Sequence, residues 1–534
     1  MVSFVLPWAL KPVFGNRLTA MYNRFLHILL AFVLVFHIKA QTNSNATKAN
    51  KLIRIIHAES LSFDREKNDA KVLSGHVQCE HEGVLLNCDT ALIIDGDNSM
   101  QAKGHILITK GDSIHVTGDK LFYDGKTKLA TLENNVKCVE KDMTLNTNFL
   151  TFDVANSIAH YYNGGKIVNK QNTLTSKHGH YYSATKEATF KEDVVLVNPE
   201  YKMNSDTLRY RLSNKTAYFV GPSIITSQQD YIYCENGWYD TNKEKARFSK
   251  NALLKTSAQI LRGDSLQYDR TNKIGLALKN ISLTDTAEKS TLYGDYILFK
   301  EKKSEAIVTK RAVYARLVEK DSIYLAADTL YHVKIDSSNH ILNAYHHVKI
   351  FKKDLQAICD SASLNTKDSL IQLFNTPTLW SNHSQATAKL IKIDIGKKTI
   401  KGFTLDDKAF LIQEADSLNK NKYNQLSGKK ITATLTNDTI RKAIISGNAE
   451  IYYYPKNKKS LVGLNKTTAP EIYLWFKAGE IERSTLKPKS SGVVDPIKEV
   501  DAENAKLKGF NWRYDEGPKS RFDLQPIKNN NMAN

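Results

Sequence analysis

One tetrapeptide in the sequence could supply a nucleophile. Residues 263–266 read Gly-Asp-Ser-Leu, the signature of the GDSL hydrolases, whose serine lies on a strand-to-helix elbow and needs a distant Asp/His pair. Asp-Ser also occurs at 112–113, 321–322, 360–361, 368–369 and 416–417, so Ser265 is better interpreted as part of a recurring strand. No Walker loop, dinucleotide fingerprint or nucleic-acid motif is present. We therefore predict no catalytic residue, no cofactor and no enzymatic activity.

Histidines and carboxylates are the candidates for a metal site. His178 and His180 would place both rings on one face of a strand, which a zinc site could use, and His346 and His347 form a second pair. No carboxylate or cysteine stands at metal-ligand spacing to complete either pair, so we predict surface or turn histidines and no metal. Recurring aspartates are interpreted as turn formers rather than as an acid/base pair. They are Asp64, Asp124, Asp153, Asp240 and Asp269.

The five cysteines are too few to indicate a disulfide framework. Cys79 and Cys88 could bridge neighbouring strands, and the sequence leaves open whether they do. Because five is an odd number, at least one thiol must stay free or pair between chains. The remaining cysteines are Cys138, Cys234 and Cys359.

An internal repeat contains most of these residues. Its pattern is an acidic residue, any residue, an apolar residue, any residue, and an aromatic or apolar residue, often followed by Asp; residues 119–124 (DKLFYD) are a clear copy. Twelve copies, some of them weak, follow one another at intervals of 28–33 residues, which is typical of a repeat array. The copies begin at positions 59, 89, 119, 148, 178, 206, 235, 264, 295, 328, 360 and 389.

A second marker, rich in Gly and Asn, lies about halfway between the copies. Examples are Gly75-His76-Val77, Gly104-His105-Ile106 and Asn135-Val136. Gly and Asn tolerate the positive φ of tight turns. We therefore expect each repeat to contain a strand, a turn, a strand, a Gly/Asn turn and a third strand. Apolar and polar residues alternate within these strands, and no amphipathic helical window of useful length interrupts them.

This pattern predicts an all-β fold. We expect an elongated repeat β-jelly roll, with two stacked, twisted antiparallel sheets around one apolar interior, and a β-solenoid is the alternative. Jelly-roll repeats are expected over residues 41–300, and more divergent repeats of the same array over 301–455. Residues 456–534 are expected to form a basic, largely flexible tail with short strand patches.

The N-terminus indicates export. Arg17 and Arg24 precede the short apolar run 25–36 (FLHILLAFVLVF), and Ala40 follows a few residues later. A basic segment, a short apolar run and a small residue at the exit are typical of a cleaved signal peptide, which we place at residues 1–40. The sequence leaves open whether translation starts at Met1 or Met21.

The chain is basic, with a formal charge of +19. Residues 1–40 contain four basic residues and no acidic one, so the mature chain would keep 19 − 4 = +15. Such a surface suits an anionic partner, and charge alone does not choose among nucleic acid, a membrane surface and a phosphorylated lipid.

The repeats of residues 58–300 resemble the OstA/LptA-like family of lipopolysaccharide-transport proteins. The residues that carry the resemblance are 58–64 (AESLSFD) followed by 72–77 (VLSGHV), and a second copy at 118–124 (GDKLFYD) that leads into 130–136 (ATLENNV). The resemblance implies an open β-jelly roll whose apolar interior receives acyl chains, stacked end to end into a bridge from the inner to the outer membrane. It thins out beyond residue 300 and is absent from the tail.

The resemblance also implies a function and a location. We expect a periplasmic lipopolysaccharide-binding bridge protein of a Gram-negative bacterium, peripheral to the membrane, that takes part in lipopolysaccharide transport and outer-membrane assembly. Its expected partners are lipopolysaccharide, with acyl chains in the β-groove, and other transport proteins of similar jelly-roll fold through sheet-edge contacts, but not nucleic acid. The alternative is a structural or adhesive extracellular β-solenoid scaffold without lipid cargo. The lipid-facing candidates are Leu61, Phe63, Leu121, Tyr123, Leu150, Phe152, Leu208, Tyr210, Leu266 and Tyr268.

Two questions stay open at this point. The sequence does not decide between an open groove and a closed core, because both need the same alternation of apolar residues. It also does not decide between a monomeric bridge and an end-to-end oligomer.

Overall fold

The computed structural model describes residues 52–524, apart from short gaps. The gaps are residues 68–69, 111–113, 141–142, 170, 200, 229, 241, 258, 288, 319–320, 337–338, 382, 397–399, 416–420, 437–438, 458–459 and 478–479. The expected signal peptide and both candidate start positions lie outside the described residues. Within the described residues the chain forms β-strands, turns and six short 3₁₀ helices, with no α-helix. The fold class is therefore all-β, as the sequence predicts.

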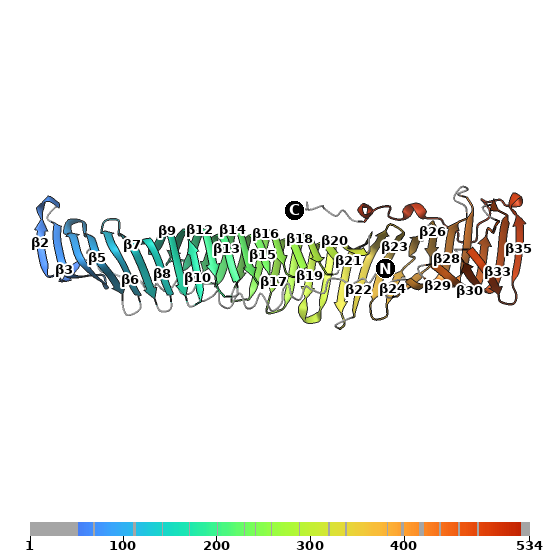
Figure 1. The fold of residues 1–534 in the computed structure, drawn as a ribbon, viewed down its shortest axis with the longest axis horizontal. Helices are drawn as coiled ribbons and strands as arrows, with labels where there is room; N and C mark the ends of the chain where they lie inside the picture. The colour runs from blue at the N-terminus through green and yellow to red at the C-terminus, as the bar shows by residue number, and fades with distance from the viewer. Residues whose placement is uncertain are drawn as a thin grey trace, which may run out of the picture. The chain divides into compact units, whose positions relative to one another are not determined.

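The chain divides into two compact units. The N-terminal unit contains the described residues up to Ser257 together with Gly263–Lys273, and the C-terminal unit contains residues 259–262 and everything from Ile274 onward. In both units most strands that are consecutive in the chain pair antiparallel, so most connections are short turns. Figure 1 shows this side-by-side arrangement for β5–β16 in the N-terminal unit.

The strands of the N-terminal unit are mostly 10–12 residues long. They are β1 (Arg54–His57), β2 (Ser60–Asp64), β3 (Ala70–His81), β4 (Val84–Ile94), β5 (Ser99–Lys110), β6 (Ile114–Asp124), β7 (Leu129–Glu140), β8 (Met143–Asp153), β9 (Ile158–Asn169), β10 (Asn172–Ser176), β11 (His178–Tyr182), β12 (Glu187–Val197), β13 (Tyr201–Arg211), β14 (Thr216–Ser227), β15 (Tyr231–Asp240) and β16 (Lys245–Lys255). Strand β17 (Gln259–Asp269) has residues in both units. Helices η1 (Arg65–Lys67) and η2 (Asp95–Asp97) lie in turns.

The C-terminal unit continues the same pattern with some longer strands. They are β18 (Ile274–Asp285), β19 (Ser290–Lys300), β20 (Glu305–Val318), β21 (Asp321–Lys334), β22 (His340–Lys352), β23 (Leu355–Asn365), β24 (Leu370–Phe374), β25 (Thr378–Ser381), β26 (Ser384–Thr387), β27 (Leu390–Ile395), β28 (Ile400–Glu414), β29 (Tyr423–Thr436), β30 (Thr439–Tyr453), β31 (Lys456–Asn457), β32 (Ser460–Leu461), β33 (Gly463–Lys477), β34 (Glu480–Leu486) and β35 (Ser491–Pro496). Helices η3 (Glu301–Lys303), η4 (Ile497–Glu499), η5 (Tyr514–Glu516) and η6 (Arg521–Asp523) complete it.

Most long strands bend once, near the middle, at a point that we call the corner. In β3 and β4, Ser74 pairs with Thr90 and Val77 pairs with Cys88, which leaves Gly75 and His76 opposite a single residue. Both Gly75 and His76 have positive φ, 77° and 44°. Two residues facing one is the geometry of a β-bulge, which bends a strand and increases its twist without ending the ladder.

The corners correct one expectation. The Gly/Asn marker does not form a turn between two strands; it lies inside one strand, as Asn134 and Asn135 do within β7. A repeat therefore contains two long strands rather than three short ones. The residue types predict the positive φ. They do not distinguish a bulge, in which strand pairing continues on both sides, from a turn, in which the strand ends.

The two halves of each bent strand belong to two facing sheets. We call sheet A the halves that contain the repeat motif, such as Leu121 in β6, and sheet B the halves on the other side of the corner, such as Cys138 in β7. Buried and exposed residues alternate in both halves, as the burial of β8 and β12 shows. Each sheet therefore turns one face to a shared core, which is the jelly-roll arrangement.

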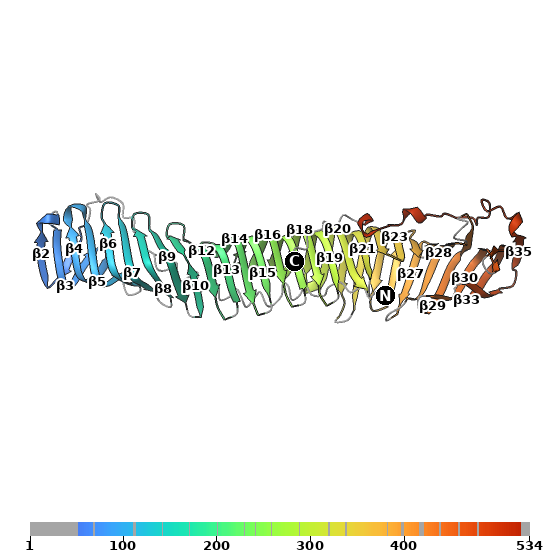
Figure 2. The ribbon, with the colours of Figure 1, turned by 45° about the horizontal axis from the view of Figure 1, so that its top comes forward.

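The C-terminal tail differs from the expected flexible segment. Residues 463–496 form strands β33 to β35, and residues 505–524, which we call the strap, pack along the outside of the C-terminal unit. Figure 2 shows the strap beside β21–β28. Hydrogen bonds from side chains to the backbone of the strap hold it in place; for example, Gln425 Nε2 donates to the carbonyl oxygen of Ala505, at 2.8 Å.

Candidate functional site

The interior of the N-terminal unit is lined by two rows of side chains on sheet A. The first row is apolar throughout. It follows the strand register from β6 to β16 as Leu121, Leu132, Leu150, Tyr161, Gly179, Phe190, Leu208, Phe219, Gly237 and Phe248. Side chains directly opposite each other on antiparallel strands lie on the same face, so this row is continuous.

The second row alternates aromatic and small residues. Tyr210 on β13 lies between Ala188 on β12 and Ala217 on β14, so the space beside each ring is filled by a methyl group. One strand of each repeat supplies the aromatic residue and the next strand supplies the alanine, so the alternation needs two strands per repeat. In register order the row is Tyr123, Ala130, Phe152, Ala159, Tyr181, Ala188, Tyr210, Ala217, Tyr239 and Ala246.

Glycines allow the largest rings into the middle of this interior. Tyr161 is 1% exposed, and its ring lies directly over Gly165 and Gly179. A Cβ atom on Gly179 would be 2.2 Å from Tyr161 Cε1, and one on Gly165 would be 2.4 Å from Cε2. The phenol hydroxyl is satisfied inside the core by Ser176 Oγ, at 2.6 Å. At this level the protein's own side chains fill the interior.

Most of the lipid-facing candidates lie in this interior. Six of them are buried, and Tyr123 and Phe152 are partly buried. Leu61 and Phe63 are 51% and 63% exposed. The six buried ones are Leu121, Leu150, Leu208, Tyr210, Leu266 and Tyr268.

The exposure of Leu61 and Phe63 has a structural cause. Leu61 lies opposite Leu73, which is completely buried, so the Leu61 side chain is on the inner face of the sheet. Phe63 is two residues further along β2 and is therefore on the same face. Among the described strands, β2 pairs with β3 alone. These two residues therefore form the inner face of a terminal rung, where apolar side chains of the interior are accessible to solvent.

The interior face of sheet B contains cysteines, and all five are free thiols. Cys79 and Cys88, the pair that could have been bridged, are both buried and not bonded to each other. Burial raises the pKa of Cys79 to about 11 and that of Cys88 to about 12. Such thiols are protonated at neutral pH and act as small apolar core residues.

The acidic residue that begins most repeats has a structural role at the corners. Asp119 Oδ2 accepts a hydrogen bond from Asn135 Nδ2, at 2.7 Å, and Glu235 Oε1 accepts one from Asn251, also at 2.7 Å. Other corner pairs join a carboxylate to a histidine imidazole, as between Asp89 and His105. The motif acid therefore stabilises the left-handed residues of the neighbouring strand.

The paired histidines have ordinary surroundings. His346 and His347 occupy a corner, where they contact Asp360 and Asp328 at 3.1 and 2.7 Å. His178 and His180 share the outer face of β11, and the ring of His180 stacks on His160 with centroids 4.0 Å apart. Across the described part of the chain, no group of three or more His, Cys, Asp and Glu residues is arranged to hold a metal ion.

The candidate nucleophile is part of an ordinary strand. Ser265 lies within β17, is buried, and accepts a hydrogen bond on Oγ from Arg247 Nε, at 3.1 Å. A GDSL serine would sit on a strand-to-helix elbow, and the described residues contain no α-helix that could form one.

Two features of the interior were missed from the sequence. One is the set of small residues that accept the rings; the alanines at 130, 159, 188, 217 and 246 recur every 29 residues, a signal that a search for apolar and aromatic positions passes over. The other is the set of glycines under Tyr161. These glycines, Gly165 and Gly179, leave room for the ring.

The turn aspartates follow the prediction. Asp124 Oδ1 accepts hydrogen bonds from the backbone N–H groups of Lys126 and Thr127, at 2.8 and 3.2 Å. These hydrogen bonds, that from Thr127 foremost, lower the pKa of the Asp124 carboxyl. Asp153, Asp240 and Asp269 accept equivalent backbone hydrogen bonds. Since these carboxylates bond their own turns, they are turn formers.

Within the described residues, no helix is long and apolar enough to cross a membrane.

A search of curated proteins finds no match. Among solved structures, the chain is similar to LptH from Pseudomonas aeruginosa, described as the LptA-homologous periplasmic component of the lipopolysaccharide transport device. The identity is 14% over 21% of this chain and 93% of LptH, and the TM-score is 0.20.

A family model described as OstA-like protein matches residues 50–206 and 207–321. The two matches are contiguous and together cover just over half of the sequence. They include the motif copies from Glu59 to Asp295 and the corners between them. The chain therefore belongs to the OstA-like protein family.

Proposed function

We propose that this protein binds lipopolysaccharide in the periplasm and takes part in its transport and in outer-membrane assembly. Membership of the OstA-like family and the resemblance of its repeats to lipopolysaccharide-transport proteins support the proposal. The observation that carries it is the terminal rung, where the inward-facing Leu61 and Phe63 leave apolar interior surface open to a ligand.

The chemistry of the interior fits acyl chains. Both rows of sheet A consist of aliphatic, aromatic and small residues, and each CH₂ group moved from water into such surroundings contributes about 0.8 kcal/mol. We propose that acyl chains enter at the terminal rung and extend along the inner face of sheet A. Near Tyr161 they would have to displace packed rings, so that level limits how far a chain penetrates.

Cations at the sheet-A turns support binding of a phosphorylated headgroup. Lys128, Lys186 and Lys215 occupy three turns of the N-terminal unit at left-handed φ values of 58°, 53° and 53°. Lys128 and Lys186 are exposed there. Ammonium groups spaced along one edge of the unit can contact phosphates outside the apolar interior.

Binding of intact and deacylated lipopolysaccharide tests the proposal. We expect the purified mature protein to bind intact lipopolysaccharide at least a hundredfold more tightly than the deacylated saccharide, because only the former carries chains to bury. Equal affinities would mean that the protein recognises the saccharide alone, and would contradict a lipid-receiving interior.

A structural scaffold without lipid cargo is the second candidate. The observation that favours it is the packing of Tyr161 onto Gly165 and Gly179, which closes the interior at that level. The scaffold predicts no difference between the two ligands above, so the same titration distinguishes the candidates.

We further propose that the terminal rung docks against a jelly roll of a related transport protein. Strand β2 has an unpaired edge among the described strands, and its apolar inner face would be covered by a further rung. Sedimentation of the mature protein at increasing concentration separates a monomeric bridge from an end-to-end oligomer. Self-association that Leu61→Asp with Phe63→Asp abolishes would assign the oligomer to this rung.

A further inference from the structure

The strap is bound to the C-terminal unit by two buried glutamines. Gln425 Nε2 donates to the carbonyl oxygen of Ala505 and Gln425 Oε1 accepts from the N–H of Leu507, both at 2.8 Å. Gln385 repeats this arrangement with the carbonyl oxygen of Asn511 and the N–H of Arg513, both at 2.7 Å. In each case one side-chain amide bonds the C=O of one residue and the N–H of the residue two positions later, as a neighbouring strand would.

The two glutamines bond backbone groups of the strap and not its side chains, so this mode of binding does not depend on the sequence of the strap. An extended segment presents C=O and N–H groups at the same two-residue spacing whatever its side chains are. Gln385 and Gln425 are 1% and 0% exposed, so in the absence of a strap their amides would be left without these partners. A segment that covers these amides must therefore offer a C=O and an N–H group in the same places, because a buried amide left unpaired is costly.

Aromatic side chains add selectivity. Phe510 and Trp512, two residues apart on the strap, both pack against Tyr423, with ring centroids 5.2 and 5.3 Å away. The nearby Leu507 lies in a cluster with Phe410 and Ile412 of β28. The face therefore fits an extended segment with aromatic residues at alternate positions.

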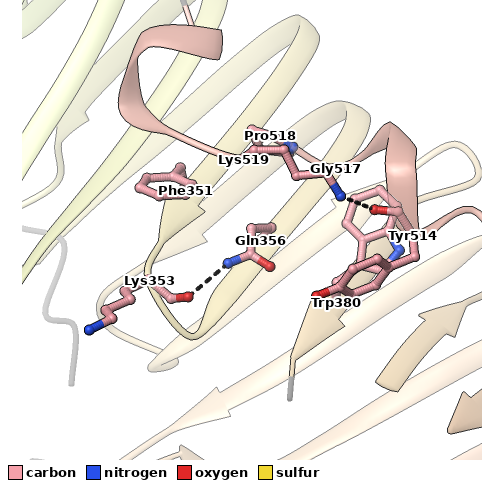
Figure 3. Close-up of a pocket in the computed structure, with 8 residues that line it drawn as sticks. All are labelled: Phe351, Lys353, Gln356, Trp380, Tyr514, Gly517, Pro518 and Lys519. Carbon is pink, nitrogen blue, oxygen red and sulfur yellow. Dashed lines mark hydrogen bonds between the residues drawn. The ribbon is translucent and has the colours of Figure 1, made fainter. Parts of the chain in front are cut away.

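A glycine favours the close approach of the strap at Trp380. A Cβ atom on Gly517 would be 3.0 Å from Trp380 Cε3, so the bare backbone lies against the indole ring. The indole Nε1 donates to Gln385 Oε1, at 3.1 Å. Figure 3 shows Trp380 and Gln356 beneath the strap residues Tyr514 and Gly517.

The two halves of the strap are held differently. Its beginning is embedded in the core, where Ala505 packs with Tyr454 and Leu464. Its distal part, residues 509–524, has many exposed residues; Gly517 and Pro518 are buried, and the part ends at the buried Leu524, which contacts Val313 and Ala326. Because residues 509–524 belong to neither sheet, they can be released without unfolding the sheets.

We propose that the strap is an internal ligand of a peptide-docking face on the outer side of sheet B. The face consists of Gln385, Gln425, Trp380, Tyr423 and Ile412, and its occupant in trans is an extended segment of a protein partner with aromatic residues at alternate positions. Release of residues 509–524 opens the distal part of this face, including Gln385 and Trp380. This inference concerns the outer surface and is independent of lipid binding in the interior.

The proposal is tested with a fluorescent peptide of residues 509–524 and the full chain. In the wild type, the attached strap competes at high local concentration and keeps peptide binding weak. A release variant with Trp512→Ala and Leu524→Asp changes the strap alone and leaves the face intact. We expect it to bind the peptide at least tenfold more tightly than the wild type does.

Two further variants show whether the glutamine is responsible. Adding Gln385→Ala or Gln385→Glu to the release variant should remove the tenfold gain, whereas Gln372→Ala, on strand β24 of sheet A, should leave it unchanged. Melting curves of each variant establish that the protein is folded. Equal binding by wild type and release variant, or a gain that survives both Gln385 changes, would overturn the proposal. A release variant that becomes a dimer would also overturn it, because the occupant would then be the strap of a second copy.

Discussion

At the scale of single residues, the interior depends on matching large side chains to small ones. Tyr161 needs the missing side chains of Gly165 and Gly179, and the ring of Tyr210 needs the small Ala188 and Ala217 beside it. Close packing of this kind makes the identity of the small residue as restrictive as that of the large one.

Replacing Gly179 by alanine should destabilise the N-terminal unit. The new Cβ would lie 2.2 Å from Tyr161 Cε1, so the ring must shift within a packed core, at a cost of about 1–3 kcal/mol. Urea unfolding followed by circular dichroism measures this loss. Gly96→Ala, whose Cβ would meet nothing within 4 Å, is the matched control. If Tyr161→Leu does not reduce the effect of Gly179→Ala in a double-mutant cycle, contact with the ring is not its cause.

A second residue-scale prediction concerns pH. Burial, with smaller contributions from His160, Lys191 and His178, lowers the pKa of His180 to about 4. In the unfolded chain the pKa of the imidazole is near its ordinary value of 6.5, so the unfolded state binds more protons between these two values. The contribution of His180 to the free energy of unfolding is therefore fully present above pH 6.5 and decreases as pH falls from 6.5 toward 4.

The variant His180→Gln should lose less stability over this window than the wild type does. Urea midpoints at pH 7.5 and 4.5 give the comparison, and His115→Gln, at an exposed position on β6, serves as control. An unchanged pH dependence in His180→Gln would assign the acid sensitivity to other groups.

At the scale of the element, the repeat is a pair of bent strands joined at corners. The sequence predicts the strands, their alternation and the repeat spacing of 28–33 residues, because each of these is a local periodic signal, but it predicts three short strands per repeat where the structure has two long ones. It does not predict that Asn134 and Asn135 bend a strand rather than end it, because that depends on register with the neighbouring strands. The role of Asp119 as the partner of Asn135 depends on the same register.

Replacing a corner residue by a β-branched one should be costly. Asn135 has a φ of 50°, which valine adopts with strain, and the change also removes the hydrogen bond to Asp119. We expect Asn135→Val to lower the free energy of unfolding by about 1–3 kcal/mol. Asn135→Gly, which keeps the φ value and loses the hydrogen bond alone, should cost less, and chemical denaturation measures both. If the two variants were equally unstable, backbone strain would not be the main term.

At the scale of the whole molecule, the repeats in the sequence predict the fold class but do not predict the strap. Each strand pairs with a neighbour that is close in sequence, so a periodic pattern is enough to predict the sheets. The strap instead bonds residues 80–174 positions earlier, as between Gln425 and Ala505 or between Lys349 and Asp523. Nothing local in the tail indicates these partners, and its basic composition favoured flexibility. Most of the apolar residues proposed from the sequence lie in the interior, and the alanines and glycines beside them were missed.

Site-specific photocrosslinking to lipopolysaccharide tests the central claim most directly. A photoreactive residue is placed at the inward-facing positions Phe63 and Leu121 and, as matched controls, at their outward-facing neighbours Ser62 and Lys120. Adducts at the inward positions and not at the neighbours are the predicted result, because the acyl chains would lie on the inner face of sheet A. Folded protein that gives no adduct at Phe63 or Leu121, or equal adducts at all four positions, would contradict a lipid-receiving interior.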